Sequence, residues 1–247
     1  MEREALFRRM EDLQERSEKG LPAHSWFLSQ EEQALVRQWS RRCAEPPQFF
    51  GGREGLERQM AFFFPEWETE KEARMEEEIC CVKLMGELSR LTHRDYLGAV
   101  LGLGLTREAI GDILPGEKAA YIFCTPAAAG CMERTLTKAG RQNVSVELVP
   151  LEQAVLPQKR VEEVTFTVKS LRLDAGAAGL FRIPRTQAVE RIERGECQVN
   201  HMVCLKPDAP LKEGDMVSLR GLGKGEIARI GGQSKKGRLF ITGEKWL

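Results

Sequence analysis

The stretch from Leu171 to Gly195 constrains the fold most, because its apolar residues recur at helical spacing in two short segments. These apolar positions are Leu173, Ala177 and Leu180 in the first segment, and Ala188, Val189 and Ile192 in the second. Each segment is predicted to form a helix that buries one face, and Gly195 ends the second helix. The same spacing leaves Arg185, Arg191 and Arg194 on the surface. Arg185 falls in the first turn of the second helix, where unpaired N–H groups and the helix dipole favour a phosphate.

The composition is that of a folded globular protein. Of the 247 residues, 42% are hydrophobic and 7% are aromatic, which suits one large domain or two to three small ones. No apolar run approaches the roughly 18 residues of a membrane span, and the N-terminal segment is too highly charged for a signal peptide. We therefore expect a cytoplasmic protein that does not enter a membrane.

The seven cysteines and three histidines predict no metal or redox site. The number of cysteines is odd, no C-x-x-C pair occurs, and most cysteines lie in apolar sequence, which favours reduced residues packed in the core. The histidines are too scattered to complete a zinc site with them. We expect neither a metal nor another cofactor.

The net charge of zero hides an uneven distribution of charge. From Leu171 to the end there are 14 Lys and Arg against 9 Asp and Glu, while the rest of the chain has 23 against 28. A basic C-terminal third on an acidic body favours a polyanionic partner, although a solvated basic face is the alternative explanation.

Residues 1–74 are predicted to form a small domain rich in helix. We expect one helix over 1–19 and a second over 29–44, where Ser29 and Glu32 have the spacing of a capping box. An aromatic cluster then predicts an apolar strand and core packing, with stacking of nucleic-acid bases as the alternative. The members of the cluster are Phe62, Phe63, Phe64 and Trp67.

Residues 75–157 are predicted to form a ferredoxin-like (RRM-like) domain with the element order βαββαβ. The expected strands are 79–85, 111–114, 120–124 and 144–148, and the expected helices are 92–105 and 125–140. Pro150 and Pro157 mark a linker at its end. The aromatic signature of RNA-recognition strands is absent, and this fold serves many unrelated functions, so it does not decide the function by itself.

Residues 158–247 are predicted to contain a linking strand, the helix pair and a small curled sheet. The expected strands are 164–168, 197–200, 202–205, 216–220, 226–230 and 237–242. The fold class is therefore α+β, in three parts.

Three short motifs look like catalytic or nucleotide-binding signatures but lack essential residues. His93-Arg94-Asp95 begins like the catalytic loop of a kinase, yet Val100 stands where that loop needs a metal-binding Asn. Gly102-Leu103-Gly104 lacks the third glycine of a dinucleotide-binding loop, and the glycines at 221, 223 and 225 lie between predicted strands. We predict no catalytic residues and no enzymatic activity.

The basic residues of the C-terminal third are better organised than any catalytic group. They fall in three turns and are expected to converge on one surface that tracks phosphates. These residues are Arg182, Arg185, Arg220, Lys224, Lys235, Lys236 and Arg238.

This part of the chain resembles the S4 RNA-binding domain. The likeness lies in Arg172-Leu173-Asp174, Arg185-Thr186-Gln187-Ala188, Gly195, Val199-Asn200, Gly214-Asp215 and the sequence RGLGKGEIARIGGQSKKGR. Two further stretches, 49–59 and 91–114, resemble the bacterial YlmH-like S4-domain proteins, so the likeness covers nearly the whole chain. In that family an N-terminal segment precedes a ferredoxin-like RNA-binding domain and a C-terminal S4 domain.

The resemblance implies a non-enzymatic, RNA-binding protein that acts on the ribosome, and we expect a monomer. The implied partners are the large ribosomal subunit with its rRNA, and tRNA, in the rescue of stalled nascent-chain complexes, with a link to cell division. The resemblance adds four RNA contacts to the basic residues: Thr186, Gln187, Arg191 and Asn200. Two alternatives stay open: an RNA-modifying enzyme with an appended S4 domain, and a protein-interaction factor in cell division.

The chain departs from the S4 pattern at two positions. Pro184 stands where Ser usually precedes the second helix, so the side-chain N-cap beside Arg185 is missing. His201 follows Asn200 where an Asn-Gly turn is commoner. The sequence therefore leaves the pose of Arg185 open.

Overall fold

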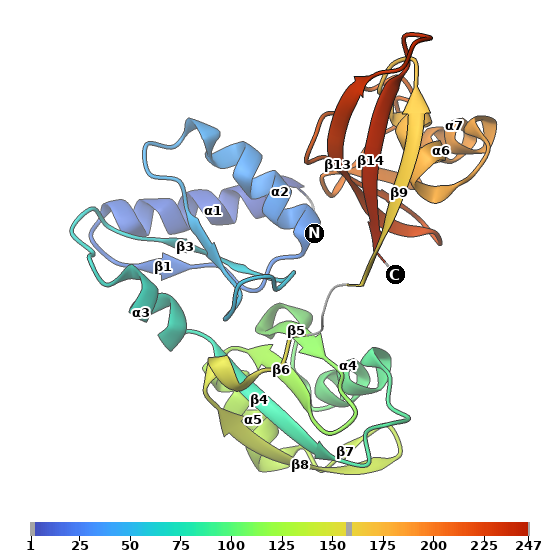
Figure 1. The fold of residues 1–247 in the computed structure, drawn as a ribbon. Helices are drawn as coiled ribbons and strands as arrows, with labels where there is room; N and C mark the ends of the chain where they lie inside the picture. Colours follow the sequence, from blue (N-terminus) through green and yellow to red (C-terminus); the bar gives the residue numbers. More distant parts are fainter. Residues whose placement is uncertain (1–2, 157–159, 247) are drawn as a thin grey trace. The chain divides into compact units, whose positions relative to one another are not determined.

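The computed structural model describes residues 3–156 and 160–246 (Figure 1). The chain divides into two compact units, Met1–Pro157 and Gln158–Leu247, and each is described by itself. The regions predicted as separate domains, 1–74 and 75–157, lie in the same unit, and their separation stays a prediction. No helix in the described ranges is long and apolar enough to cross a membrane.

The N-terminal part of the first unit combines helices with a small antiparallel sheet of strand order β1-β3-β2. Its elements are α1 (Arg3–Glu18), β1 (Ala23–His24), α2 (Gln30–Trp39), a 3-10 turn (Ser40–Arg42), β2 (Gln48–Phe50), β3 (Met60–Phe63) and α3 (Lys71–Glu77). The predicted capping box is present, since Ser29 Oγ accepts from Glu32 N and Glu32 Oε2 accepts from Ser29 N. The three phenylalanines 62–64 are at most 9% exposed. The predicted core packing is confirmed for these three rings, which leaves them no free face for stacking on bases. For Trp67, the fourth member of the cluster, the prediction is wrong, because its side chain is 61% exposed.

A five-stranded antiparallel sheet with two helices forms the remainder of this unit. Its elements are β4 (Cys80–Gly86), α4 (His93–Leu101), a 3-10 turn (Arg107–Ala109), β5 (Ile110–Leu114), β6 (Ala120–Cys124), α5 (Pro126–Thr135), β7 (Lys138–Ala139), β8 (Gln142–Val149) and a 3-10 turn (Leu151–Gln153). The strand order β5-β6-β4-β8-β7 contains the predicted βαββαβ succession as a split βαβ arrangement. Both helices end earlier than predicted. Gly104 has a φ of +82° just after α4, and residues 138–139 pair with β8 instead of extending α5.

The two faces of this sheet are covered by different parts of the unit. Helices α4 and α5 pack on one face, where Val82 and Ile122 are fully buried. The N-terminal part covers the other face, and the packing there joins Phe27, Leu56, Met60, Phe62, Cys81, Tyr121 and Phe123 in one core. The approach is close, because a Cβ on Gly111 would lie 2.7 Å from Phe27 Cε1 and a Cβ on Gly52 would lie 2.6 Å from Phe123 Cδ1.

Polar contacts fasten the same two parts at strand β5. The carboxylate of Asp112 accepts the backbone N–H groups of Glu57 and Arg58. The Arg58 guanidinium donates to the carbonyl oxygens of Phe27 and Ile110 at 2.6 and 3.0 Å. Burial raises the pKa of Asp112 and lowers the pKa of Arg58. The hydrogen bonds and the attraction between the two groups favour their charged forms, and for Arg58 the nearby carboxylates of Glu32 and Glu108 act in the same direction.

The predicted linker after Pro150 begins inside the first unit. Ala154 is 2% exposed. Arg53 donates to the carbonyl oxygens of Glu152 and Ala154 at 2.9 and 2.7 Å, which holds this segment on the unit. Pro157, the predicted end of the linker, lies outside the described residues.

The second unit is a six-stranded antiparallel sheet with a helix pair packed on it (Figure 1). Its elements are β9 (Val161–Val168), α6 (Leu173–Phe181), α7 (Arg185–Glu193), β10 (Cys197–Val199), β11 (Met202–Val203), β12 (Met216–Leu219), β13 (Gly223–Gln233) and β14 (Leu239–Trp246). The strand order is β11-β10-β12-β13-β14-β9. The predicted helix pair is confirmed, with Leu173, Ala177 and Leu180 fully buried. Gly179 allows close packing of α6, since a Cβ there would overlap the ring of Phe166.

Three of the cysteines are core residues, as predicted. Cys81, Cys124 and Cys197 are buried and free. Burial raises the pKa of Cys81 and of Cys197 to about 12, so these thiols stay protonated near neutral pH.

We predict that Gly111→Ala destabilises the first unit, because the new methyl group would collide with the Phe27 ring. Overpacking of this kind costs about 1–3 kcal/mol. Urea unfolding of the full chain measures it. Gly98→Ala is the matched control, since Gly98 is an exposed residue of α4 with no other atom near its Cβ position. That control should stabilise the chain by about 0.5–1 kcal/mol, and equal effects of the two changes would contradict the packing described here.

Candidate nucleic-acid interface

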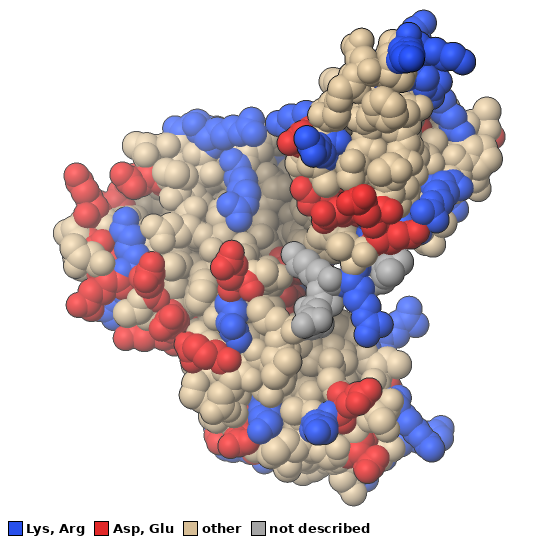
Figure 2. All heavy atoms as spheres, viewed as in Figure 1, with Lys and Arg blue, Asp and Glu red and all other residues tan. Residues whose placement is uncertain are grey.

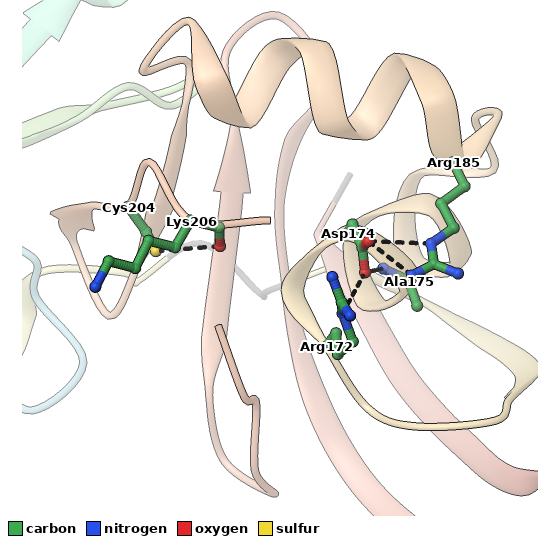
Figure 3. Close-up of polar contacts among 6 residues, drawn as sticks. All are labelled: Arg172, Asp174, Ala175, Arg185, Cys204 and Lys206. Atoms are coloured by element: carbon green, nitrogen blue, oxygen red, sulfur yellow. Dashed lines mark hydrogen bonds and ion pairs between the residues drawn. The ribbon is translucent and has the colours of Figure 1, made fainter. Parts of the chain in front are cut away.

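A buried carboxylate organises two arginines at the start of the helix pair (Figure 3). Asp174, in the first turn of α6, is 2% exposed. Its Oδ2 accepts hydrogen bonds from Nε and Nη2 of Arg185 at 3.1 and 2.7 Å. Its Oδ1 accepts the N–H of Ala175 at 2.7 Å and lies 3.6 Å from Nε of Arg172. Arg185 is therefore held in one direction while 58% of its side chain stays exposed.

The start of α7 has no side-chain cap, as the sequence predicts. Pro184 is the N-cap residue and makes no capping hydrogen bond. The next three residues, Arg185, Thr186 and Gln187, are exposed. The pose of Arg185, which the sequence leaves open, is set by the buried acid of α6 instead of by a cap.

Four cations lie at the tip of the hairpin β13–β14, and Figure 2 shows Lys and Arg side chains gathered there. This hairpin cluster consists of Lys169, Lys235, Lys236 and Arg238, all exposed. Arg238 donates to Oγ1 and to the carbonyl oxygen of Thr167, which fastens the turn to β9. Lys169 joins the cluster because it directly follows β9, which pairs with β14.

A second group of cations lies at the opposite end of the sheet. This turn cluster consists of Arg182, Arg191, Arg220 and Lys224. Arg182 forms an ion pair with Glu162 at 2.8 Å, and Lys224 Nζ lies 4.2 Å from the ring centre of Trp246. Arg191 Nη1 donates to the carbonyl oxygen of Arg220 at 2.9 Å, and the Arg191 side chain is only 25% exposed. Arg191 is expected on the surface and is partly exposed there, with its guanidinium bound to the turn after β12. Its contact with RNA stays a prediction.

The register of β14 on β9 separates the two clusters. Leu239 pairs with Val168 near the hairpin tip, and Trp246 pairs with Val161 at the other end. These seven residue steps correspond to about 23 Å at roughly 3.3 Å per residue. The expected convergence of all three turns on one surface is therefore wrong. Lys235, Lys236 and Arg238 lie together, whereas Arg220 and Lys224 lie at the far end.

Asn200 makes contacts within the protein. It and His201 form the two-residue turn between β10 and β11, with φ values of +50° and +67° that suit a type I′ turn. The Asn200 amide donates to Asp215 Oδ1 at 2.9 Å and accepts the N–H of Met216 at 3.0 Å. Its contact with RNA stays a prediction.

Three residues are not predicted as site residues from the sequence: the partly exposed Arg172, the exposed Lys169, and the buried Asp174 that binds Arg185. The motif Arg172-Leu173-Asp174 carried a signal for the first two, since an Asp between apolar helix positions needs a cationic partner when buried. Lys169 carried no signal, because only the long-range pairing of β9 with β14 brings it to the hairpin. Within the described ranges, no three His, Cys, Asp or Glu residues form a group that could hold a metal ion.

Comparison with known proteins identifies the family. Residues 71–153 match the family model described as "Putative RNA-binding domain in YlmH". The chain is 33% identical over 219 residues to ribosome-associated protein quality control protein P2 of Bacillus subtilis (strain 168), covering 89% of this chain and 85% of that protein. The chain belongs to the YlmH family. The solved structure of cell division protein YlmH from Streptococcus pneumoniae shares the fold, with a TM-score of 0.51 and 22% identity, over 63% of this chain and 96% of that chain.

In this member of the YlmH family we predict that Asp174→Asn releases Arg185 and destabilises the second unit. The change removes the charged hydrogen-bond acceptor of Arg185 and the ion-pair partner of Arg172, which we expect to cost about 1–3 kcal/mol. Hydrogen exchange of α6 and α7 amides in urea measures the stability of this unit separately. Asp208→Asn is the matched control, because Asp208 is exposed nearby and should change stability by less than about 0.5 kcal/mol. A loss no larger than in the control would show that Asp174 does not anchor the helix pair.

Proposed function

We propose that this YlmH-family protein is a non-enzymatic RNA-binding protein that acts on the ribosome. The observation that carries the proposal is the pair of basic clusters at opposite ends of the sheet on which the helix pair packs, with Arg185 of that pair held by Asp174. The match to an RNA-binding family model and the name of the Bacillus subtilis relative support the same role. The proposed ligands are large-subunit rRNA, tRNA or both, bound by a monomer in the cytoplasm during rescue of stalled nascent-chain complexes.

We further propose that the second unit is an S4 domain and that the βαββαβ part of the first unit is a ferredoxin-like domain. The helix pair followed by short antiparallel strands supports the first assignment. The strand order β5-β6-β4-β8 supports the second.

The geometry favours recognition of RNA by shape and backbone. Arg185 is already oriented, so less side-chain entropy is lost when it meets a phosphate. The uncapped first turn of α7, with exposed Thr186 and Gln187, adds N–H groups suited to a phosphate oxygen. Two clusters about 23 Å apart at roughly 3.3 Å per residue suit contact with separate stretches of one structured RNA.

We predict that Lys235→Ala with Lys236→Ala weakens RNA binding and lowers its salt dependence. Each lost phosphate contact removes about 0.7–0.9 log units of affinity per log unit of salt. Filter binding of deproteinised bacterial large-subunit rRNA at several salt concentrations measures this slope. These lysines are better targets than Arg185, because removing Arg185 also leaves the buried Asp174 without its main partner.

The control replaces Lys206 and Lys212, two exposed lysines of the same unit, with Ala. An unchanged slope for the hairpin variant, or an equal change in the control, would contradict the assigned surface. Sedimentation of cell lysate on a sucrose gradient tests the ribosomal role. Co-migration with the large subunit supports it, whereas a profile confined to free-protein fractions would favour the modifying-enzyme or cell-division alternative.

A further inference from the structure

The sheet of the first unit cannot offer bases a stacking surface. The aromatic residues on its outer face, Tyr121 and Phe123, are 8% and 0% exposed, because the N-terminal part packs over them. Further along β4, Lys83 is held in an ion pair with Glu147 of β8 at 3.6 Å. Stacking of RNA on this face would require displacing part of the core.

Exposed cations instead gather where the start of α4 meets the β7–β8 hairpin. A Cβ on Gly140, in the hairpin turn, would lie 3.1 Å from Asp95 Oδ1 and 3.2 Å from Leu91 Cδ2. Exposed residues with cationic or imidazole side chains flank these contact points. They form a surface that we term the α4 edge, which consists of Arg90, His93, Arg94, Lys138 and Arg141.

The α4 edge carries an excess of positive charge over the two acids of the same segments. Within the described ranges, none of its four Lys and Arg residues takes part in an ion pair or side-chain hydrogen bond. The same two segments, 86–95 and 137–143, contain two acids, Glu87 and Asp95. The Asp95 carboxylate accepts from Thr92 N and Oγ1, both at 2.7 Å, and these hydrogen bonds lower its pKa. Asp95 is therefore occupied with capping α4.

We propose that the first unit binds the sugar–phosphate backbone of RNA through the α4 edge and not through its sheet. This inference rests on the proposed RNA-binding function and locates a second contact, apart from the helix-pair unit. Cations on a helix start and an adjoining hairpin turn form a convex edge, which suits backbone contacts and not the enclosure of single bases. The exposed polar side chains of Thr137 and Asn143 beside it can add neutral hydrogen bonds.

The test replaces Arg94 and Arg141 with Ala in the full chain and measures binding of deproteinised large-subunit rRNA at several salt concentrations. Both side chains are exposed, so a thermal melt should show unchanged folding. We expect the salt slope to fall by about 1.4–1.8 log units for two lost phosphate contacts. The matched control replaces Arg8 and Arg9, two exposed arginines of α1, and removes the same charge. A further variant, Lys83→Ala, probes the sheet face.

Each outcome separates this inference from the proposed function. A fall in slope for Arg94→Ala with Arg141→Ala, without a comparable fall in the α1 control, supports the α4 edge. Equal falls in both variants would overturn it in favour of unspecific attraction, and a larger effect of Lys83→Ala would place the RNA on the sheet. If only the Lys235 and Lys236 changes weaken binding, the α4 edge is wrong and the proposed function stands. If the unaltered chain binds no rRNA, both fail.

Discussion

The packing of the N-terminal segment on the outer face of the β4–β6–β5 sheet is the constraint on which the first unit depends. Gly52 and Gly111 lie so close to Phe123 and Phe27 that neither position can hold a methyl group without a shift. Interiors packed at this density transmit any change in one part to the other. The sheet is consequently a buried support, and the chemistry of this unit has to occur at its edges and turns.

In the second unit, a buried charge fixes the geometry of the helix pair. A carboxylate that is 2% exposed would be costly if unpaired, but two guanidinium groups and a backbone N–H surround Asp174. The buried charge of Asp174 orients Arg185, because the two hydrogen bonds direct the guanidinium across the turn between the helices. The absence of a cap at Pro184 is thereby tolerated, since the direction of Arg185 does not depend on the N-cap residue.

Much of the fold could be predicted from local sequence patterns. The capping box at Ser29, the apolar spacing of Leu173, Ala177 and Leu180, and the strand and turn residues between 79 and 148 are local signals, and the structure contains the corresponding elements. The strands β1 and β2 were missed because segments of two or three residues carry no periodicity.

The candidate site was harder to predict for a physical reason. Whether an arginine is free or braced depends on partners distant in sequence, such as Glu162 for Arg182 and the Arg220 carbonyl for Arg191. The separation of the two clusters likewise depends on the register of β14 on β9. Residue type alone indicates which side chains can bind phosphate. Where these side chains lie on the surface depends on the tertiary pairing of the strands.

The division of the chain into two units, joined covalently between Pro157 and Gln158, has a consequence for affinity. If each unit contacts the same RNA, the second contact forms within an already tethered complex, at an effective concentration on the order of millimolar. Two individually weak surfaces can then keep a ribosomal ligand bound for long times. The complex can still dissociate in steps, one surface after the other.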